Sequence, residues 1–180
     1  MPIFVYGASK LGCEALISAY SRTFGVRGLI FRLANVVGGR YTHGVIVDFV
    51  RKLQDNSNVL EILGDGGQSR SYLHVEDLVD AVFLALKHFL DVEKKVEVFN
   101  VGSLDRVGVK RIAEIVCEEM RLEDLEFRFT GGVDGGRGWR GDVKSMLLSV
   151  DRLLSLGWKP SMSSEEVVRL GCRELLRFLL

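Results

Sequence analysis

The sequence predicts an α/β fold built on parallel strands. Short apolar runs rich in β-branched residues, at 26–33 and 96–101, have the composition of buried strands. Helical recurrences of apolar residues alternate with such runs, which is typical of strand–helix–strand units with parallel pairing. At 180 residues, the chain is long enough to bury a core of its own.

The expected elements follow one another in order. Apolar residues at helical spacing predict a helix over 8–24, which Gly25 would end, and the strand 26–33 comes next. After it we expect a loop at 35–44, a helix at 45–53, strands at 59–63 and 72–75, a helix at 76–90, a strand at 96–101, a helix at 109–120, a strand at 125–130, a glycine-rich loop at 131–141, and two helices around the turn at 157–160. The clearest apolar stripe is that of the 76–90 helix, formed by Leu78, Val79, Val82, Phe83, Leu86 and Leu90.

Composition and charge narrow the function classes. The chain has 24 Lys and Arg against 24 Asp and Glu, so it has no overall field that would attract nucleic acid or an anionic membrane. The longest apolar tract, 78–90, is interrupted by charge and is too short to span a bilayer. Met1-Pro2 does not open a signal peptide. We therefore expect a cytoplasmic protein without nucleic-acid or membrane partners.

Cysteine and histidine spacing predicts reduced thiols and no metal site. The cysteines are widely spaced in apolar helical patterns, as expected of small core residues, at Cys13, Cys117 and Cys172. The histidines have no ligand spacing with one another or with a cysteine, at His43, His74 and His88.

An ionisable pair stands near the start of the chain. Tyr6 and Lys10 are four residues apart where the first helix begins, so they share one of its faces. A free tyrosine titrates near pH ~10, too high for a base at neutrality, and a neighbouring ammonium stabilises the phenolate. The pair is suited to proton transfer. The same spacing also occurs by chance on many helices.

Five motifs occur in the order seen in a known enzyme family. They are Pro2 with Val5-Tyr6-Gly7-Ala8-Ser9-Lys10 and Glu14, then RLANVVG from Arg32, GDGGQSRSYLHVED from Gly64, FNVG from Phe99, and Gly141-Asp142 followed by Asp151 and LGWKP from Leu156. Together they resemble the extended short-chain dehydrogenase/reductase family, specifically its NAD-dependent nucleotide-sugar epimerases and dehydratases. Within this family, the motifs most resemble those of UDP-glucose 4-epimerases. The resemblance implies a partial Rossmann-like fold, NAD as cofactor and a nucleotide-diphosphate sugar as substrate.

The resemblance also implies roles for individual residues. Tyr6 would be the catalytic base and Lys10 its supporting cation, and both would contact NAD together with Leu33. The sugar nucleotide would be bound by Asn35, Arg70, Arg137, Arg140 and Asp142.

Several of these residues also have plain structural interpretations. Arg70 offers a planar guanidinium that suits a diphosphate, and it is also what a solvated turn carries. Asn35 follows an apolar strand, where α/β sheets place ligands, and it also fits an ordinary turn. We expect His74 and Asp77 to fix the start of the 76–90 helix, because a carboxylate is favoured in a first turn.

The glycine-rich segment 131–141 imitates a dinucleotide-binding fingerprint. GRGWRG, from Gly136 to Gly141, satisfies G-x-G-x-x-G. However, 131–135 separates it from the preceding strand, and 142–146 does not open an amphipathic helix. The resemblance implies instead that this loop carries an arginine to the substrate diphosphate. Trp139 fills the usual place of that arginine, so Arg137 and Arg140 are both candidates.

The resemblance further implies that the chain is the C-terminal part of an epimerase. The family's glycine-rich NAD motif, and the Ser or Thr that completes its catalytic set, have no counterpart here. We expect one partial domain, with a Rossmann remnant at 1–44 and 72–103 and a substrate-binding lobe at 45–71 and 104–180. Such a chain would be a marginal monomer, forming a homodimer through the 8–24 helix or depending on an N-terminal partner chain.

Two other functions stay open. One is a catalytically silent truncated chain that binds a nucleotide sugar or pairs with a full-length relative. The other is a nucleotide-sugar dehydratase or reductase of the same family, which shares every motif visible here.

Overall fold

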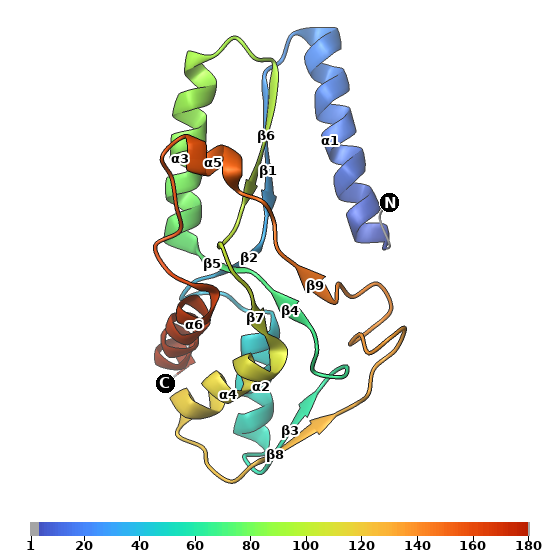
Figure 1. Cartoon of the computed structure of the whole chain (residues 1–180), viewed down its shortest axis with the longest axis vertical. Helices are drawn as coiled ribbons and strands as arrows, with labels where there is room; N and C mark the ends of the chain where they lie inside the picture. The colour runs from blue at the N-terminus through green and yellow to red at the C-terminus, as the bar shows by residue number, and fades with distance from the viewer. Residues whose placement is uncertain (1–3, 180) are drawn as a thin grey trace.

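The computed structural model describes residues 4–179 and has the predicted α/β composition (Figure 1). The helices are α1 (Val5–Phe24), α2 (Val45–Asp55), α3 (Val75–Asp91), α4 (Val109–Met120), α5 (Asp151–Ser155) and α6 (Ser164–Leu179). The strands are β1 (Gly28–Leu33), β2 (Asn35–Val37), β3 (Val59–Ile62), β4 (Ser69–Arg70), β5 (Tyr72–His74), β6 (Val96–Val101), β7 (Val107–Gly108), β8 (Glu126–Phe129) and β9 (Ser145–Met146). Within residues 4–179, no helix is both long enough and apolar enough to cross a membrane.

Parallel pairs form the framework, as the sequence predicts. β1 pairs with β6 along its whole length, from Gly28 opposite Val96 to Leu33 opposite Val101. β2 pairs in parallel with β5, and β3 with β8. β4 lies between antiparallel β7 and parallel β9. The chain passes from the end of β1 directly into β2, so the polar residues that follow β1 stay at its carboxyl end.

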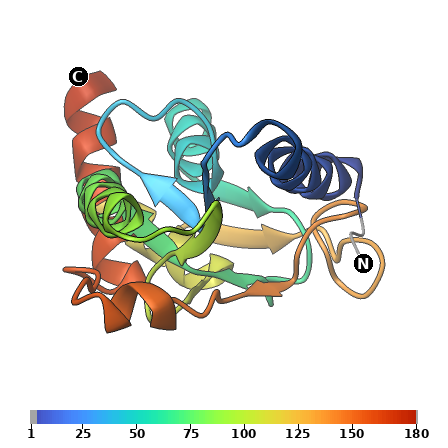
Figure 2. The same cartoon turned by 90° about the horizontal axis from the view of Figure 1, so that it is seen from above.

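Helices α1 and α3 lie on opposite sides of the β1–β6 pair, and the view from above shows the same arrangement (Figures 1 and 2). The core on the α3 side also includes α5 and the turn after it. Its buried members are Leu73, Ala81, Ala85, Phe99, Val101, Val150, Leu153 and Trp158.

Much of the apolar surface of these two helices faces outward. On α1, Leu16 and Phe24 are 60% and 68% exposed. The buried positions of α3 include Ala81, Ala85 and Phe89, whereas Phe83 and Leu90 of the predicted stripe are 67% and 64% exposed. Most of the predicted stripe of α3 therefore faces away from the core, although its Leu78 packs against the core.

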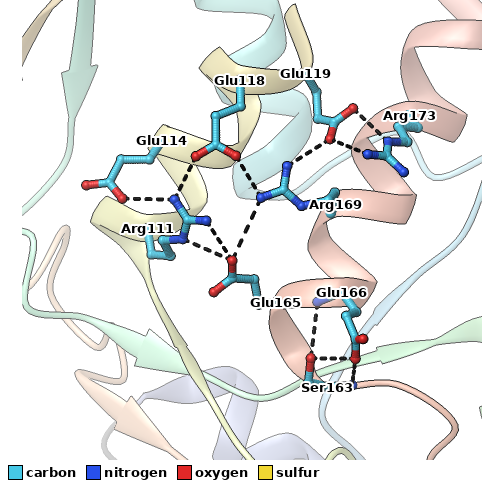
Figure 3. A network of polar contacts seen from close by, with 9 residues as sticks. All are labelled: Arg111, Glu114, Glu118, Glu119, Ser163, Glu165, Glu166, Arg169 and Arg173. Carbon is cyan, nitrogen blue, oxygen red and sulfur yellow. Dashed lines mark hydrogen bonds and ion pairs between the residues drawn. The ribbon is translucent and has the colours of Figure 1, made fainter.

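A second core lies among α2, α4, α6 and the β3–β8 pair. Its largest fully buried side chains are Ile46, Phe49, Leu60, Ile62, Ile112 and Ile115. Outside this core, alternating arginines and glutamates join α4 to α6 (Figure 3). Arg111 pairs with Glu165, Arg169 with Glu118 and Glu119, and Arg173 with Glu119.

The sequence-based boundaries were wrong where strands are very short. Residues 35–37, expected in a loop, form β2, and Arg70 lies in β4 rather than in a turn. β7 and β9 were not expected at all. A strand of two or three residues has too few side chains to show alternation, so only its hydrogen-bonding partners define it.

The cysteines and the residues at the start of α3 were also assigned places from the sequence. Cys117 and Cys172 are buried free thiols as predicted, but Cys13 is exposed, so the prediction that it is a core residue was wrong. His74 caps α3 as predicted, since the main-chain N–H of Glu76 donates to His74 Nδ1 at 3.4 Å. Asp77 lies in the first turn of α3, and its Oδ2 accepts hydrogen bonds from the main chain and hydroxyl of Ser161 at 3.1 and 3.0 Å.

Candidate active site

One cleft of about 890 Å³ gathers most of the predicted site residues. It lies where β1 ends and is walled by the start of α1, the segment from β2 to α2, β4 and the loop before β9. Of the predicted residues, the cleft is lined by Tyr6, Leu33, Asn35, Arg70 and Asp142. The lining found within residues 4–179 does not include Lys10, Arg137 or Arg140.

Tyr6 and Lys10 lie one turn apart on α1, as their spacing predicts. The Lys10 ammonium is 5.2 Å from the centroid of the Tyr6 ring, within the range of a cation–π interaction. The Tyr6 side chain is open to solvent as well as to the cleft, at 67% exposed. Pro2, part of the motif around this pair, lies outside the described residues.

A bidentate ion pair holds α1 against β1. Arg32 Nε and Nη2 donate to the two carboxylate oxygens of Glu14, at 2.8 and 2.6 Å. This hydrogen bonding lowers the pKa of the Glu14 carboxyl below its usual value. Because Glu14 is one helical turn beyond Lys10, the pair connects α1 near Lys10 to the end of β1.

Asn35 opens β2 and has an amide without a partner. Its Nδ2 is buried, and no residue among 4–179 accepts a hydrogen bond from it. A buried donor without an acceptor is costly, so a site where one lines a cleft is prepared for a ligand oxygen.

Arg70 and Asp142 meet on the cleft wall. Arg70 Nη2 donates to Asp142 Oδ1, and the Asp142 carboxylate is only 2% exposed. Its other oxygen, Oδ2, accepts from the main-chain N–H of Gly138 at 3.0 Å, and the Asp142 N–H donates to the Trp139 carbonyl at 3.1 Å. One buried carboxylate thus holds both the arginine and the turn 138–142.

The two arginines left as alternatives have different surroundings. Arg137 donates through Nε to the Asp142 carbonyl at 2.9 Å and through Nη1 to the Asp134 carbonyl, both inside its own loop. Arg140 is exposed on the same loop. The structure therefore brings Arg70 and Asp142 together with Tyr6 and Asn35, and leaves these two arginines off the lining.

The turn 64–68 braces that loop. Gly64 has a φ of +93°, and a Cβ there would lie 2.7 Å from the Gly136 carbonyl oxygen, so only glycine fits. Asp65 accepts from Gly67 N–H at 2.8 Å and pairs with Lys144 at 2.8 Å. Gly64 therefore allows close packing between the two loops.

Other cleft residues were not assigned from the sequence. They are His43, Tyr41, Gln68, Tyr72 and Trp139, among others. Burial raises the pKa of Tyr72 to about 12 and raises that of Tyr41 further, so both hydroxyls stay protonated at neutral pH. The presence of Trp139 where the family usually has an arginine was the one sequence signal that marked any of them.

NAD, which the resemblance implies, fits the described residues in part. Tyr6 and Leu33 lie open at the carboxyl end of β1, where α/β sheets bind ligands, and Lys10 is one turn from Tyr6. As predicted, the glycine-rich segment 136–141 is not followed by a helix, because the next element is strand β9. Residues 4–179 thus include the side chains that the resemblance assigns to NAD, and contain no strand–glycine–helix turn for its pyrophosphate.

Comparison with known proteins agrees with this geometry. The model of the "NAD dependent epimerase/dehydratase family" matches residues 1–102. A Methanocaldococcus jannaschii protein, provisionally named a UDP-glucose 4-epimerase, is 31% identical over 172 residues, which make up 93% of this chain and 52% of that protein. A crystal structure of UDP-galactose 4-epimerase superimposes with a TM-score of 0.89 at 43% identity, covering 100% of this chain and 56% of that chain.

A further solved structure of a similar protein contains NAD. The UDP-glucose 4-epimerase of Thermus thermophilus, in complex with NAD, has a TM-score of 0.75 at 26% identity, over 97% of this chain and 54% of that one. This chain spans about half the length of the relatives it matches. Family model, relatives and fold agree, and the chain belongs to the NAD-dependent epimerase/dehydratase family of extended short-chain dehydrogenases/reductases.

Proposed function

We propose that this chain supplies the substrate-binding part and the catalytic base of an NAD-dependent nucleotide-sugar 4-epimerase, with a UDP-hexose as substrate. The observation that carries the proposal is the single cleft in which Tyr6, Asn35, Arg70 and Asp142 all take part. In this proposal, 1–44 and 72–103 are the Rossmann portion, and 45–71 and 104–180 are the substrate-binding lobe. The protein would act in the cytoplasm.

Tyr6 is the proton acceptor of the proposed reaction. Its phenolate oxygen takes the proton of the sugar 4-hydroxyl as that carbon becomes a ketone, and returns it when the hydroxyl forms again. The Lys10 ammonium stabilises the negative charge of the phenolate. NAD, held in part by Tyr6, Lys10 and Leu33, would supply the reversible hydride acceptor.

The polar residues of the cleft bind the sugar nucleotide. Arg70 retains donors beyond the one used by Asp142, and its guanidinium suits a diphosphate oxygen pair. The unpartnered Asn35 amide donates to a ligand oxygen. Asp142 lines the same cleft and orients Arg70 through their ion pair. Arg137 and Arg140 are candidates for a second phosphate contact from the loop.

Calorimetry with UDP-glucose tests the binding proposal. Arg70→Leu should weaken binding roughly tenfold or more, because a charge-assisted hydrogen bond is lost. Tyr6→Phe should leave binding intact. Arg128→Leu is the matched control, since Arg128 is a 61% exposed arginine of β8 that pairs with Glu126. Equal affinity of the Arg70 and Arg128 variants would contradict the proposal.

Turnover tests the catalytic proposal. In an assembly with NAD and a chain that supplies the pyrophosphate-binding turn, Tyr6→Phe should lower the epimerisation rate by about 10² or more. Preserved turnover in that variant would refute the role of Tyr6. A product that has lost water would point instead to a dehydratase of the same family.

A second candidate is a binding chain that pairs with a longer relative or with its own copy. It is favoured by the exposed apolar surfaces of α1 and α3, and by β1, which pairs only with β6 among the described strands. Such surfaces invite association. Binding of UDP-glucose with no turnover in any assembly would support this function over the first.

A further inference from the structure

Trp139 leaves a large aromatic surface open in the cleft. Its side chain is 51% exposed and lines the cavity. The other tryptophan of the chain, Trp158, is 6% exposed, and its Nε1 donates to the Asp77 carbonyl at 3.2 Å. An indole that stays half exposed on a ligand cleft has apolar area that a bound ring can cover.

The position of Trp139 is fixed from two sides. Its carbonyl accepts from the Asp142 N–H, and the preceding Gly138 N–H donates to the buried Asp142 carboxylate. The Arg70 guanidinium carbon lies 6.0 Å from the centroid of the indole. A ligand whose phosphate binds Arg70 therefore brings its neighbouring atoms within reach of the indole.

The loop of Trp139 also touches the start of α1. A Cβ built on Gly141 would lie 2.6 Å from the Phe4 ring, so these two residues are in close contact. Phe4 is two residues before Tyr6, and Gly141 is two residues after Trp139. The loop of Trp139 thus neighbours both Arg70, the proposed phosphate-binding arginine, and the helix end that carries the proposed base.

We infer that the Trp139 indole packs against the sugar ring of the nucleotide-diphosphate sugar and selects the sugar-bearing ligand over the free nucleoside diphosphate. The inference rests on the proposed function and adds a specificity-determining residue to it. The ring that lies next to the diphosphate on the Tyr6 side is the sugar to be epimerised. A pyranose has a face of C–H bonds, which packs on an aromatic face and covers it from water.

The test compares UDP with UDP-glucose on the 180-residue chain by calorimetry. Wild type should bind UDP-glucose more tightly than UDP. Trp139→Leu should weaken the affinity for UDP-glucose roughly tenfold, because most of the burial of one ring face is lost. It should leave the affinity for UDP unchanged. Trp139→Phe should restore most of the difference. Emission from the buried Trp158 reports on folding in each variant.

The outcomes are distinct. Equal weakening of UDP and UDP-glucose in Trp139→Leu would place the indole on the nucleotide and overturn the inference. No weakening of either, with UDP-glucose still dependent on Arg70, would also overturn it while leaving the proposed function standing. If the wild-type chain binds neither ligand, or if Arg70→Leu leaves both affinities unchanged, the proposed function itself fails.

Discussion

Arg70 forms an ion pair with Asp142, whose carboxylate is buried at 2% exposure. The same carboxylate accepts a hydrogen bond from the main chain of Gly138. A strand residue and a loop more than seventy positions away are thus held by one charge. This contact shapes the cleft wall on which Trp139 lies.

Asp142→Asn should destabilise the chain by about 1–3 kcal/mol, because it removes the charge that compensates Arg70 in a largely buried setting. Urea unfolding measures this. Asp134→Asn is the matched control in the same loop, since the Asp134 contact with Arg137 uses the main-chain carbonyl. Equal unfolding midpoints for the two variants would show that the ion pair contributes nothing.

Replacing each of two helical glycines by alanine should change the stability of the chain in opposite directions. A Cβ on Gly171 of α6 would lie 2.1 Å from Val37 Cγ1, so Gly171→Ala should destabilise by about 1–3 kcal/mol through overpacking. Gly12 of α1 has nothing within 4 Å of its Cβ position, so Gly12→Ala should stabilise by about 0.5–1 kcal/mol. Thermal or urea unfolding of both variants compares them directly, and a stabilised Gly171→Ala variant would contradict the packing.

The three thiols should differ in reactivity. Burial raises the pKa of Cys172 to about 12 and raises the pKa of Cys117, whereas Cys13 is exposed. Since the thiolate is the reactive form, iodoacetamide at mildly alkaline pH should label Cys13 first and the other two only in denaturant. Mass spectrometry counts the labels, with Cys13→Ser as the control. Early native labelling of Cys172 would refute its burial.

The α4–α6 ion pairs should make stability fall in acid. Hydrogen bonds from Arg173 lower the pKa of Glu119, those from Arg169 lower that of Glu118, and those from Arg111 lower that of Glu165. A folded-state pKa below the unfolded value gives stability that is present above the unfolded pKa and is lost as pH falls through the folded one. We therefore expect the urea concentration at the unfolding midpoint to decrease as the pH is lowered below about 4.5.

Glu119→Gln should remove part of that acid dependence and lower the stability at neutral pH by about 1 kcal/mol, as for other ion pairs near the surface. Glu126→Gln is the control, because Glu126 and Arg128 form a pair of which both side chains are more than 60% exposed. A Glu119→Gln variant with the same pH profile as wild type would show that the network has no part in acid unfolding.

The apolar surfaces of α1 and α3 should make the purified chain self-associate with rising concentration. Leu16→Ser with Phe83→Ser should reduce this association, since both residues are at least 60% exposed. Leu104→Ser, at a 56% exposed leucine outside both helices, should have little effect. Sedimentation velocity across a dilution series separates these results. A monomer with a sharp cooperative melt at every concentration would contradict the prediction.

The amino-acid pattern alone indicated the α/β class, the long helices and the strands β1 and β6, though not that these two strands pair with each other. These elements carry many side chains with one periodicity, so local pattern and final structure agree. The sequence also indicated the family, because the motif residues around Tyr6, Asn35, Arg70 and Asp142 keep their order. Among the polar residues that line the cleft, it indicated Tyr6, Asn35, Arg70 and Asp142 as site residues, but not Tyr41, His43, Gln68 or Tyr72.

Other features of the fold and of the cleft depend on tertiary contacts. The short strands β2, β4, β7 and β9 exist because of their partners, and the outward face of α3 and the exposure of Cys13 depend on what packs nearby. Sequence spacing could not show that Asp142 holds Arg70 in the cleft wall, or that Arg137 bonds within its own loop while Arg140 is exposed. A contact between residues far apart in the chain leaves no pattern in the local sequence, because the packing of the whole chain determines it.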